Sequence, residues 1–414
     1  MGKDGVMTTD RPTARPALPQ PRPAGAPPMF EVMAKPTGAI CNLDCEYCFF
    51  LSKESLYPGS DFRMSDDLLE TYISQLMESQ RSNHITFVFQ GGEPTMMGLP
   101  FFERMVELLQ KHRPAHMQID LAIQTNGTLL TDEWCAFLKR NPVLVGLSMD
   151  GPAPLHDRYR VDKGGKPTHH RVLAAWQRLR AHEIDTNILC TVNSANSQQP
   201  LEVYRYFRDE LTADFLQFIP IVEREGDGVT DRSIRPADWG SFLTSIFDEW
   251  LTNDVGRVFV QTFDVALGIW LGRGSSLCVF AETCGHALAL EHNGDLYSCD
   301  HFVDAEHRLG NIREKHMLEL VALPQQRKFG QDKRNGLTQQ CRECPVLFAC
   351  HGECPKSRFA TNERGEANHQ YLCEGYYAFF THIDAPMRAM AQLLRDGKYA
   401  DEIMPMARRG DFAL

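Results

Sequence analysis

Residues 41–48 read CNLDCEYC and place three cysteines, Cys41, Cys45 and Cys48, within eight residues. A loop this short can turn all three thiolates toward one small metal cluster. Soft thiolate ligands favour iron-sulfur clusters, copper(I) or zinc. A four-iron cluster takes four ligands, so three cysteines leave one iron open, and an open position distinguishes a reactive metal site from a closed structural one. The spacing therefore predicts chemistry at a metal, with an incomplete zinc knuckle or unrelated thiols as the simpler alternatives.

The composition is that of an enzyme of the reducing cytosol. The chain has 414 residues, 43% hydrophobic and 23% charged, enough for a large core and more than one domain. Its 13 cysteines are too sparse for a disulfide-stapled secreted domain. No long apolar stretch or signal peptide is found, and the net charge of −11 argues against a general nucleic-acid binder. We expect a soluble cytoplasmic protein whose partners include neither nucleic acid nor membrane.

Short apolar runs alternate with amphipathic stretches from Phe30 onward. We expect strands at 85–89, 119–123, 143–149, 186–192 and 215–219. Helices are expected near 68–77, behind the N-cap candidate Ser65, and at 131–139, 172–179 and 201–211. This alternation predicts a parallel α/β sheet, open or curled into a barrel. Such folds place their chemistry at the carboxyl ends of the strands.

A polar or glycine-rich signature follows each of the first three predicted strands. These signatures are QGGEP at 90–94, QTNG at 124–127 and SMDG at 148–151. Adjacent glycines let the backbone approach a ligand closely, and Glu93 could hold a ligand amine. Any one of these loops alone would more often be an ordinary turn. Three on one rim, together with the cysteine triad, predict a binding site.

The triad, with Tyr47 inside it and Gly91-Gly92-Glu93-Pro94 one βα unit later, resembles the radical S-adenosylmethionine (SAM) family. That family builds a partial, TIM-like (β/α)6 barrel. The resemblance implies that the open iron chelates the amine and carboxylate of SAM, and that reduction cleaves SAM to a 5′-deoxyadenosyl radical. A planar, always-charged guanidinium suits carboxylate capture by Arg160, with Ser148 beside it. The implied SAM-binding residues are Tyr47, Gly91, Gly92, Glu93, Ser148 and Arg160, and Asp150 and Asn126 are further pocket candidates.

Eight more cysteines occupy the last third of the chain and divide naturally into two fully ligated clusters, suited to electron transfer or structure. Two zinc sites are the alternative, because thiolate spacing separates zinc from iron poorly. The pattern resembles SPASM, the twin-cluster extension of peptide-modifying radical SAM enzymes, which implies three 4Fe-4S clusters in all. In that resemblance Cys278, Cys284, Cys299 and Cys354 hold the inner cluster, and Cys341, Cys344, Cys350 and Cys373 hold the outer one. Cys135 and Cys190 have no cysteine neighbours and are expected to be inert core residues.

Five segments make up the predicted domain organisation. A proline-rich disordered tail spans 1–30, and a radical SAM partial barrel spans 31–230. A helical connector at 231–272 leads to the cysteine-rich SPASM domain at 273–385. A C-terminal helix and tail, to which we assign no function, occupy 386–414.

Within the twin-cluster group, residues 31–385 are similar to anaerobic sulfatase-maturating enzymes, which oxidise one cysteine or serine of a sulfatase to Cα-formylglycine. The likeness rests on the triad, on residues 90–94, 124–127, 148–152 and 156–160, and on Cys299-Asp300. In that family an aspartate directly after the third inner-cluster cysteine acts as general base, and Asp300 stands in that place. A physical argument agrees: hydrogen removal from Cβ leaves a radical that must still lose one electron and one proton. A base beside an oxidising cluster serves both needs.

The resemblance also implies partners: an unfolded sulfatase segment with a Cys-x-Pro-x-Arg or Ser-x-Pro-x-Arg type of motif, and a flavodoxin- or ferredoxin-like electron donor. The acidic residues Glu223, Glu225, Asp227 and Asp231 could meet the substrate arginine, although a solvated loop is the simpler interpretation. Two other functions stay open. One is a twin-cluster maturase that crosslinks or epimerises a ribosomally made peptide. The other is a non-catalytic electron-transfer protein, which would leave the glycine-rich strand ends unexplained.

Overall fold

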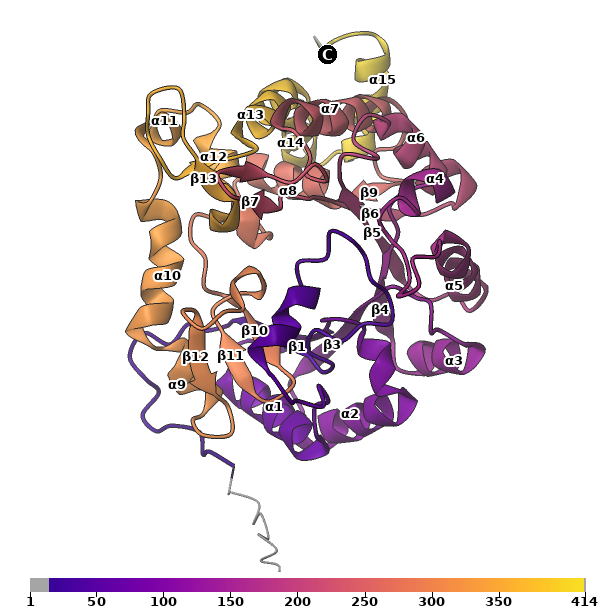
Figure 1. The fold of residues 1–414 in the computed structure, drawn as a ribbon. Helices are drawn as coiled ribbons and strands as arrows, with labels where there is room; N and C mark the ends of the chain where they lie inside the picture. The colour runs from indigo at the N-terminus through magenta and orange to yellow at the C-terminus, as the bar shows by residue number, and fades with distance from the viewer. Residues whose placement is uncertain (1–14, 413–414) are drawn as a thin grey trace, which may run out of the picture.

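Six parallel strands frame the N-terminal half of the computed structural model, which describes residues 15–412. They pair in chain order and curl into a partial barrel (Figure 1). Burial alternates along β2 and β5, as expected for strands with one face on the core. The expected α/β barrel is confirmed. The six strands are β1 (Glu31–Lys35), β2 (His84–Phe89), β3 (Gln118–Thr125), β4 (Val143–Ser148), β5 (Thr186–Val192) and β6 (Phe215–Pro220).

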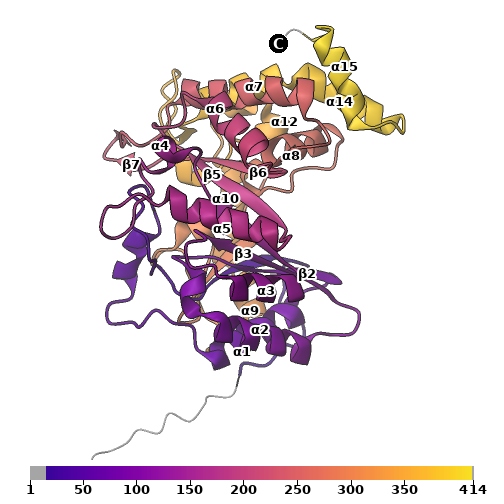
Figure 2. The ribbon, with the colours of Figure 1, turned by 90° about the vertical axis from the view of Figure 1, so that its right-hand side faces the viewer.

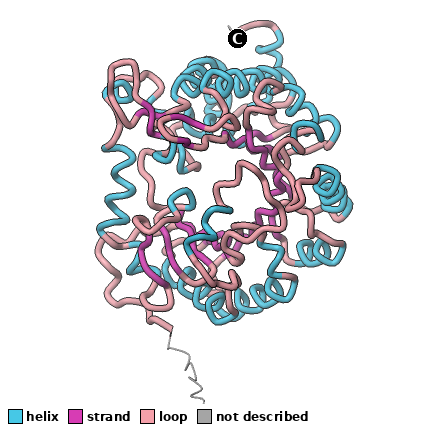
Figure 3. The backbone as a smooth tube through the Cα atoms, viewed as in Figure 1, coloured by secondary structure: helices cyan, strands magenta, loops and turns pink. Residues whose placement is uncertain are grey.

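Helices cover the outside of the curled sheet (Figure 3). They are α1 (Asp66–Ser79), α2 (Leu99–His112), α3 (Asp132–Arg140), α4 (Ala153–His156), α5 (His169–Ala181) and α6 (Pro200–Arg205). Ser65 precedes α1 as expected, and Asp66 and Asp67 place negative charge at the positive end of the helix. The helix expected at 201–211 is interrupted, because the amide of Leu211 bonds the carbonyl of Tyr206 five residues earlier. Its second half is a π-turn, Tyr206–Glu210.

The sheet continues beyond the six strands at both edges. At one edge β10 (Ala287–Glu291) runs parallel to β1, followed by antiparallel β11 (Asp295–Tyr297) and β12 (Arg308–Asn311). At the other edge β9 (Phe259–Val260) pairs with β6, giving ten strands in one sheet. The segments expected to form a connector and a separate cysteine-rich domain therefore both add strands to the barrel sheet. The boundaries at 231 and 273 stay predictions.

Among the remaining helices, α7, α14 and α15 lie together at the top of Figure 2, whereas α9 packs against α1 at the other end of the molecule. They are α7 (Pro236–Asn253), α8 (Gln261–Trp270), α9 (Met317–Val321), α10 (Pro324–Asn335), α11 (Gln339–Arg342), α12 (Leu347–Cys350), α13 (Cys373–His382), α14 (Asp384–Arg395) and α15 (Ile403–Arg408). Two hairpins are β7 (Arg224–Glu225) with β8 (Gly228–Val229), and β13 (Arg358–Ala360) with β14 (His369–Gln370). Met387 and Met390 bury the inner face of α14.

Residues 15–30 form neither helix nor strand, but they pack along the end of α1. Arg15 pairs with Glu78 at 2.7 Å, and Arg22 donates to the carbonyl of Ser79 at 2.9 Å. The sequence predicts disorder for residues 1–30. Of these, residues 1–14 lie outside the described range, and the contacts of residues 15–30 were not expected from composition. Within residues 15–412, no helix is both long and apolar enough to span a membrane.

Candidate active site

The cysteine triad lies on the loop that leaves the carboxyl end of β1. Its three thiols are partly buried, and none of the 13 cysteines forms a disulfide. Burial, with smaller effects of Glu93, Cys45 and Cys48, raises the pKa of Cys41 to about 12. Burial likewise raises the pKa of Cys45 to about 11. Cys41 and Cys45 are therefore protonated at neutral pH unless a bound cation stabilises the thiolates, and the three soft donors of the triad fit an iron-sulfur cluster.

The backbone of the glycine-rich loop 90–94 hydrogen-bonds to the residues just before the triad. The amide of Gly92 donates to the Gly38 carbonyl at 2.8 Å, and the amide of Glu93 donates to the Ile40 carbonyl at 2.9 Å. A Cβ on Gly92 would stand only 1.9 Å from the Ile40 oxygen. Since these amides are occupied, a ligand amine at this loop would meet backbone carbonyls rather than N–H groups.

The carboxylate of Glu93 points into the protein and is fully buried. It accepts hydrogen bonds from the hydroxyls of Thr95 and Thr125, and from the amide of Asn126 at 2.8 Å. Burial raises its pKa, although these donors oppose the shift. Glu93 therefore connects the glycine-rich loop to the end of β3, and its carboxylate already accepts hydrogen bonds from protein groups. The Asn126 side-chain amide in turn reaches the sulfur of Cys41 at 3.6 Å, so this predicted pocket residue does border the triad.

Tyr47 and Arg160 meet on a buried carboxylate, that of Asp150. Arg160 Nε lies 2.9 Å from Asp150 Oδ2, and the Tyr47 hydroxyl donates to the same oxygen. Burial is the largest single effect and opposes ionisation of Asp150, but the charge of Arg160 and the hydrogen bonds from Arg160 and Tyr47 together lower the pKa of the carboxyl. The charge of Arg160 also acts on Cys45, against the larger effect of burial on that thiol. Asp150 thus fixes both predicted SAM-binding side chains beside the triad.

Ser148, which the resemblance implies as a second ligand of the SAM carboxylate, lies at the end of β4. Its hydroxyl accepts from the side-chain amide of Gln124 at 2.9 Å, across neighbouring strands. The two residues expected to share one carboxylate are therefore committed to different partners, Gln124 for Ser148 and Asp150 for Arg160. If Ser148 and Arg160 bind the same ligand carboxylate, Arg160 would have to use its guanidinium nitrogens other than Nε.

Asp300 lies on the turn after Cys299 and faces Lys35, the last residue of β1. Lys35 Nζ is 2.5 Å from Asp300 Oδ1, and the lysine side chain is fully buried whereas that of Asp300 is 20% exposed. No described residue makes an aligned hydrogen bond to Oδ1, so the contact is an ion pair. Burial is the largest single effect and would raise the pKa of Asp300, but the charge of Lys35, together with smaller effects of His301 and Lys356, makes the net shift downward. The carboxylate is therefore held ionised.

Two aromatic residues join this turn to the triad loop. Phe49 packs edge to face on the ring of His301, with 5.7 Å between ring centroids. Phe50 lies under the Lys35 ammonium, 4.5 Å from ring centroid to nitrogen. Both residues directly follow Cys48 in the chain. The Cys299–His301 turn therefore lies against the segment that leaves the triad.

The eight C-terminal thiols fall into two spatial groups. The pKa of Cys299 is raised to about 12 by burial, then by its neighbours Asp300, Cys278 and Cys284, and Cys354 adjoins Cys299 and Cys284. The pKa of Cys373 is raised to about 12 by burial and by Cys341 and Cys344, and Cys350 adjoins Cys373 and Cys341. We call these the inner and outer thiol groups; their members are Cys278, Cys284, Cys299 and Cys354, and Cys341, Cys344, Cys350 and Cys373. Cys135 and Cys190 lie buried in the core.

Among residues 15–412, no cluster of His, Cys, Asp or Glu side chains is compact enough to bind one metal ion. A multi-iron cluster instead separates its ligands, since each thiolate binds a different iron. The chemistry and grouping of the thiols fit such clusters. The residues that the sequence did not single out are Lys35 and His301. His301 directly follows Asp300, whereas Lys35 lies six residues before Cys41 and no signal in the sequence marked it.

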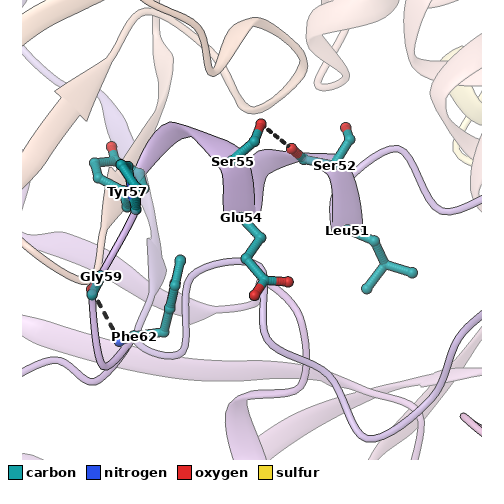
Figure 4. A pocket seen from close by; sticks show the side chains of 9 residues that line it. Leu51, Ser52, Glu54, Ser55, Tyr57, Gly59 and Phe62 are labelled. Carbon is teal, nitrogen blue, oxygen red and sulfur yellow. Dashed lines mark hydrogen bonds between the residues drawn. The ribbon is translucent and has the colours of Figure 1, made fainter.

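A hollow of about 510 Å3 lies on the loop after the triad. Figure 4 shows Leu51, Ser52, Glu54, Tyr57 and Phe62 around it. All of its lining residues come from segment 51–62, and none is a predicted ligand of SAM or a cluster. The hollow is therefore separate from the candidate active site.

Comparison with known proteins first defines the class. The Radical SAM superfamily matches residues 36–207, and the SPASM iron-sulfur cluster-binding domain matches residues 278–345. Together with the curled sheet and its thiol groups, these matches define a radical SAM enzyme that uses SAM and iron-sulfur clusters. Crystal structures of Streptococcus suis SuiB bound to its precursor peptide share only the fold, with a TM-score of 0.60 at 15% identity over 84% of this chain and 76% of that one.

The family follows from nearer relatives. A serine-type anaerobic sulfatase-maturating enzyme of Bacteroides thetaiotaomicron is 42% identical over 94% of this chain and 97% of its own length. A cysteine-type enzyme of Clostridium perfringens is 35% identical over 85% of this chain and 96% of its own. The structure of native anSMEcpe with bound AdoMet and Cp18Cys peptide superposes with a TM-score of 0.80 at 34% identity, covering 89% of this chain and all of that one. The chain belongs to the family of anaerobic sulfatase-maturating enzymes.

Proposed function

We propose that this protein oxidises a cysteine or serine side chain of a sulfatase polypeptide to Cα-formylglycine. The observation that carries the proposal is the position of Asp300. Its carboxylate is next to Cys299 of the inner thiol group, is paired with Lys35 at the end of β1, and lies on a turn packed against the triad loop. A base is thus held between the two places where the reaction needs it.

The proposed cofactors are SAM and three 4Fe-4S clusters, held by the triad and by the inner and outer thiol groups. Tyr47, Arg160, Ser148 and the Gly91–Glu93 loop would bind SAM. When bound, these groups supply the radical that removes one hydrogen atom from the substrate Cβ and accept the electron that the substrate radical releases. Asp300 accepts the proton of the substrate thiol or hydroxyl at Oδ2, since Oδ1 faces Lys35. A cysteine thereby becomes a thioaldehyde, which water converts to formylglycine and sulfide, and a serine becomes the aldehyde directly.

The proposed substrate is an extended segment with a Cys-x-Pro-x-Arg or Ser-x-Pro-x-Arg type of motif, because the target side chain must enter the barrel. Of the acidic residues considered for its arginine, Glu223 already pairs with Arg232 at 2.8 Å. Glu225, Asp227 and Asp231 are exposed beside the β7–β8 hairpin and are the remaining candidates. A flavodoxin- or ferredoxin-like protein is the proposed electron donor.

The test is an anaerobic assay of the reconstituted protein with SAM, a reductant and paired peptides that carry the cysteine or the serine motif. Product masses and 5′-deoxyadenosine are measured together. We expect formylglycine on at least one peptide, and a loss of at least about 100-fold in Asp300→Asn, in line with removal of a general base. Asp332→Asn is the matched control, because Asp332 makes only a surface pair with Lys328. SAM cleavage with both peptides unchanged would refute the sulfatase assignment and favour a peptide-crosslinking maturase.

A further inference from the structure

Two buried cations, Arg358 and Lys333, lie between the inner and outer thiol groups. Arg358 is 7% exposed and Lys333 is 1% exposed. In the described part of the chain, all the hydrogen bonds that these two side chains donate go to backbone carbonyls. The nearby carboxylate of Glu353 bonds instead to the side-chain amide of Gln370. Glu353 is the one carboxylate whose charge acts on both cations, and burial raises its pKa and so disfavours its ionised form. Two buried cations beside one such carboxylate are costly, so the arrangement calls for further negative charge.

Arg358 binds the three residues that separate an outer ligand from an inner one. Its guanidinium donates to the carbonyls of His351, Gly352 and Glu353, at 2.8, 2.8 and 3.2 Å. These are the residues between Cys350 of the outer group and Cys354 of the inner group. The three have φ angles of +46°, +67° and +48°, and left-handed backbone at two residues other than glycine is strained. The guanidinium therefore holds a strained link between the two groups.

Lys333 extends this positive region to the inner group. Its carbonyl accepts a hydrogen bond from Arg358, and its ammonium donates to the carbonyl of Cys278 at 2.6 Å and of Val279 at 2.8 Å. The charge of Arg358 acts on Cys284 of the inner group and on Cys341 and Cys350 of the outer one. The charge of Lys333 acts on Cys278, Cys284 and Cys354, all inner thiols. Arg358 thus faces both groups, and Lys333 faces one.

We propose that Arg358 and Lys333 are the counter-charges of the two auxiliary iron-sulfur clusters and raise their reduction potentials, Arg358 for both clusters and Lys333 for the inner one. This inference rests on the proposed function, which places a cluster in each thiol group. A cluster ligated by four thiolates is anionic, and each added electron makes it more so. A fixed cation nearby therefore stabilises the reduced state more than the oxidised one, and potentials follow net charge and burial. The two residues are positioning residues, because neither has to touch the substrate.

The experiment is an anaerobic redox titration of the reconstituted protein, followed by electron paramagnetic resonance. Replacing the three triad cysteines by alanine in every sample leaves only the auxiliary signals. In Arg358→Gln we expect both midpoint potentials to fall, with the reduced-to-oxidised ratio at a fixed potential at least tenfold lower, which is about 59 mV for one electron. Arg358→Lys should restore most of this loss because it restores the charge. In Lys333→Met only the inner cluster should shift.

Arg364→Gln is the matched control, since Arg364 lies on the same segment but makes an exposed pair with Glu343. Unchanged midpoints in Arg358→Gln and Lys333→Met, with full iron and sulfide content, would overturn the proposal and leave the proposed function intact. Failure of Arg358→Lys to restore the potentials would also overturn it, because the residue would then act through hydrogen bonding alone. If the Arg358→Gln protein does not assemble its clusters, the midpoint potential of the inner cluster in Lys333→Met tests the proposal. A parent protein that binds no iron at these eight thiols would instead contradict the cluster assignment in the proposed function.

Discussion

Gly92 has to be a glycine for the loop that carries the cysteine triad to pack as it does. The sequence assigned the paired glycines to close approach of a ligand. The structure shows a closer need, because the Gly92 α-carbon packs against the Ile40 carbonyl, immediately before Cys41. This requirement depends on residues about 50 positions apart, so spacing along the chain did not show it.

Gly92→Ala should therefore damage the triad without touching a cysteine. A Cβ that meets the Ile40 oxygen must separate loop 90–94 from segment 38–40, and overpacking of this kind costs about 1–3 kcal/mol. We expect a lower free energy of unfolding in denaturant, and loss of the triad's share of iron on reconstitution. Gly228→Ala is the control, since the nearest atom to its Cβ would be 3.9 Å away and its φ is not positive. Equal effects of the two substitutions would contradict this account of Gly92.

His156 makes the stability of the barrel depend on pH. Its Nδ1 accepts a hydrogen bond from the Asp150 amide and its Nε2 meets the Thr168 hydroxyl, so the ring is neutral. Burial lowers the pKa of His156 to about 3. Unfolding returns the pKa to about 6.5, so below about pH 6.5 the unfolded state binds a proton that the folded state does not. Stability is therefore lost as the pH falls from about 6.5 toward 3.

The contribution of this one histidine is about 1.4 kcal/mol per pH unit in that window. His156→Asn removes the titrating group, so the free energy of unfolding should fall less steeply with acidification in the variant. Denaturant unfolding at several pH values between 7 and 4 measures both slopes. Identical slopes would show that His156 is not the group that titrates.

Local spacing singled out the triad and the glycine-rich loop, and the family resemblance singled out Asp300; the roles of these residues stay predictions. The partners of these residues were not predictable in the same way. Arg160 and Tyr47 share Asp150, which was only a pocket candidate, and Ser148 accepts a hydrogen bond from Gln124. Each of these pairings depends on how neighbouring strands are registered, and a single sequence does not contain that register.

At the scale of elements, β1 departs most from what its sequence suggests. The strand reads EVMAK, and a lysine at the end of a short strand would ordinarily reach solvent. Lys35 is instead fully buried, because Asp300 from a distant segment supplies its counter-charge. The long apolar strands β2 to β6 and the helices with regular apolar spacing were predicted well, since their pattern is local.

Lys35→Met tests this pairing. Removing the ammonium leaves the partly buried Asp300 without its counter-charge, and we expect the free energy of unfolding to fall by about 1–3 kcal/mol. Adding Asp300→Asn should recover part of that loss, because the unpaired charge is then gone. A double-mutant cycle in denaturant measures the coupling. Lys328→Met, on an exposed helix face, is the control; a coupling energy near zero would mean that the pair does not stabilise the fold.

For the molecule as a whole, Gln75 joins the barrel to the cysteine-rich half. Its side chain, fully buried on α1, donates to the Ile312 carbonyl at 2.9 Å and accepts from the Met317 amide at 2.8 Å. Gln75→Met keeps the volume but leaves both backbone groups unpaired, which costs about 1–3 kcal/mol. We expect lower stability and faster hydrogen exchange across 312–321. The surface variant Gln392→Met, which loses only a bond to Asp396, should change neither.

The class of fold was predictable because strand-helix alternation and cysteine spacing repeat along the chain. The continuity of the ten-stranded sheet was not, since the pairing of β1 with β10 joins segments roughly 250 residues apart in the sequence.

The same pairing has a consequence for synthesis of the protein. β1 is synthesised before β10, which emerges from the ribosome roughly 250 residues later. At about 5–20 residues per second, one edge of β1 waits on the order of 12–50 s for its partner. An unpaired strand edge is a template for association with other chains. The nascent barrel therefore depends on protection of that edge until the cysteine-rich half has been made.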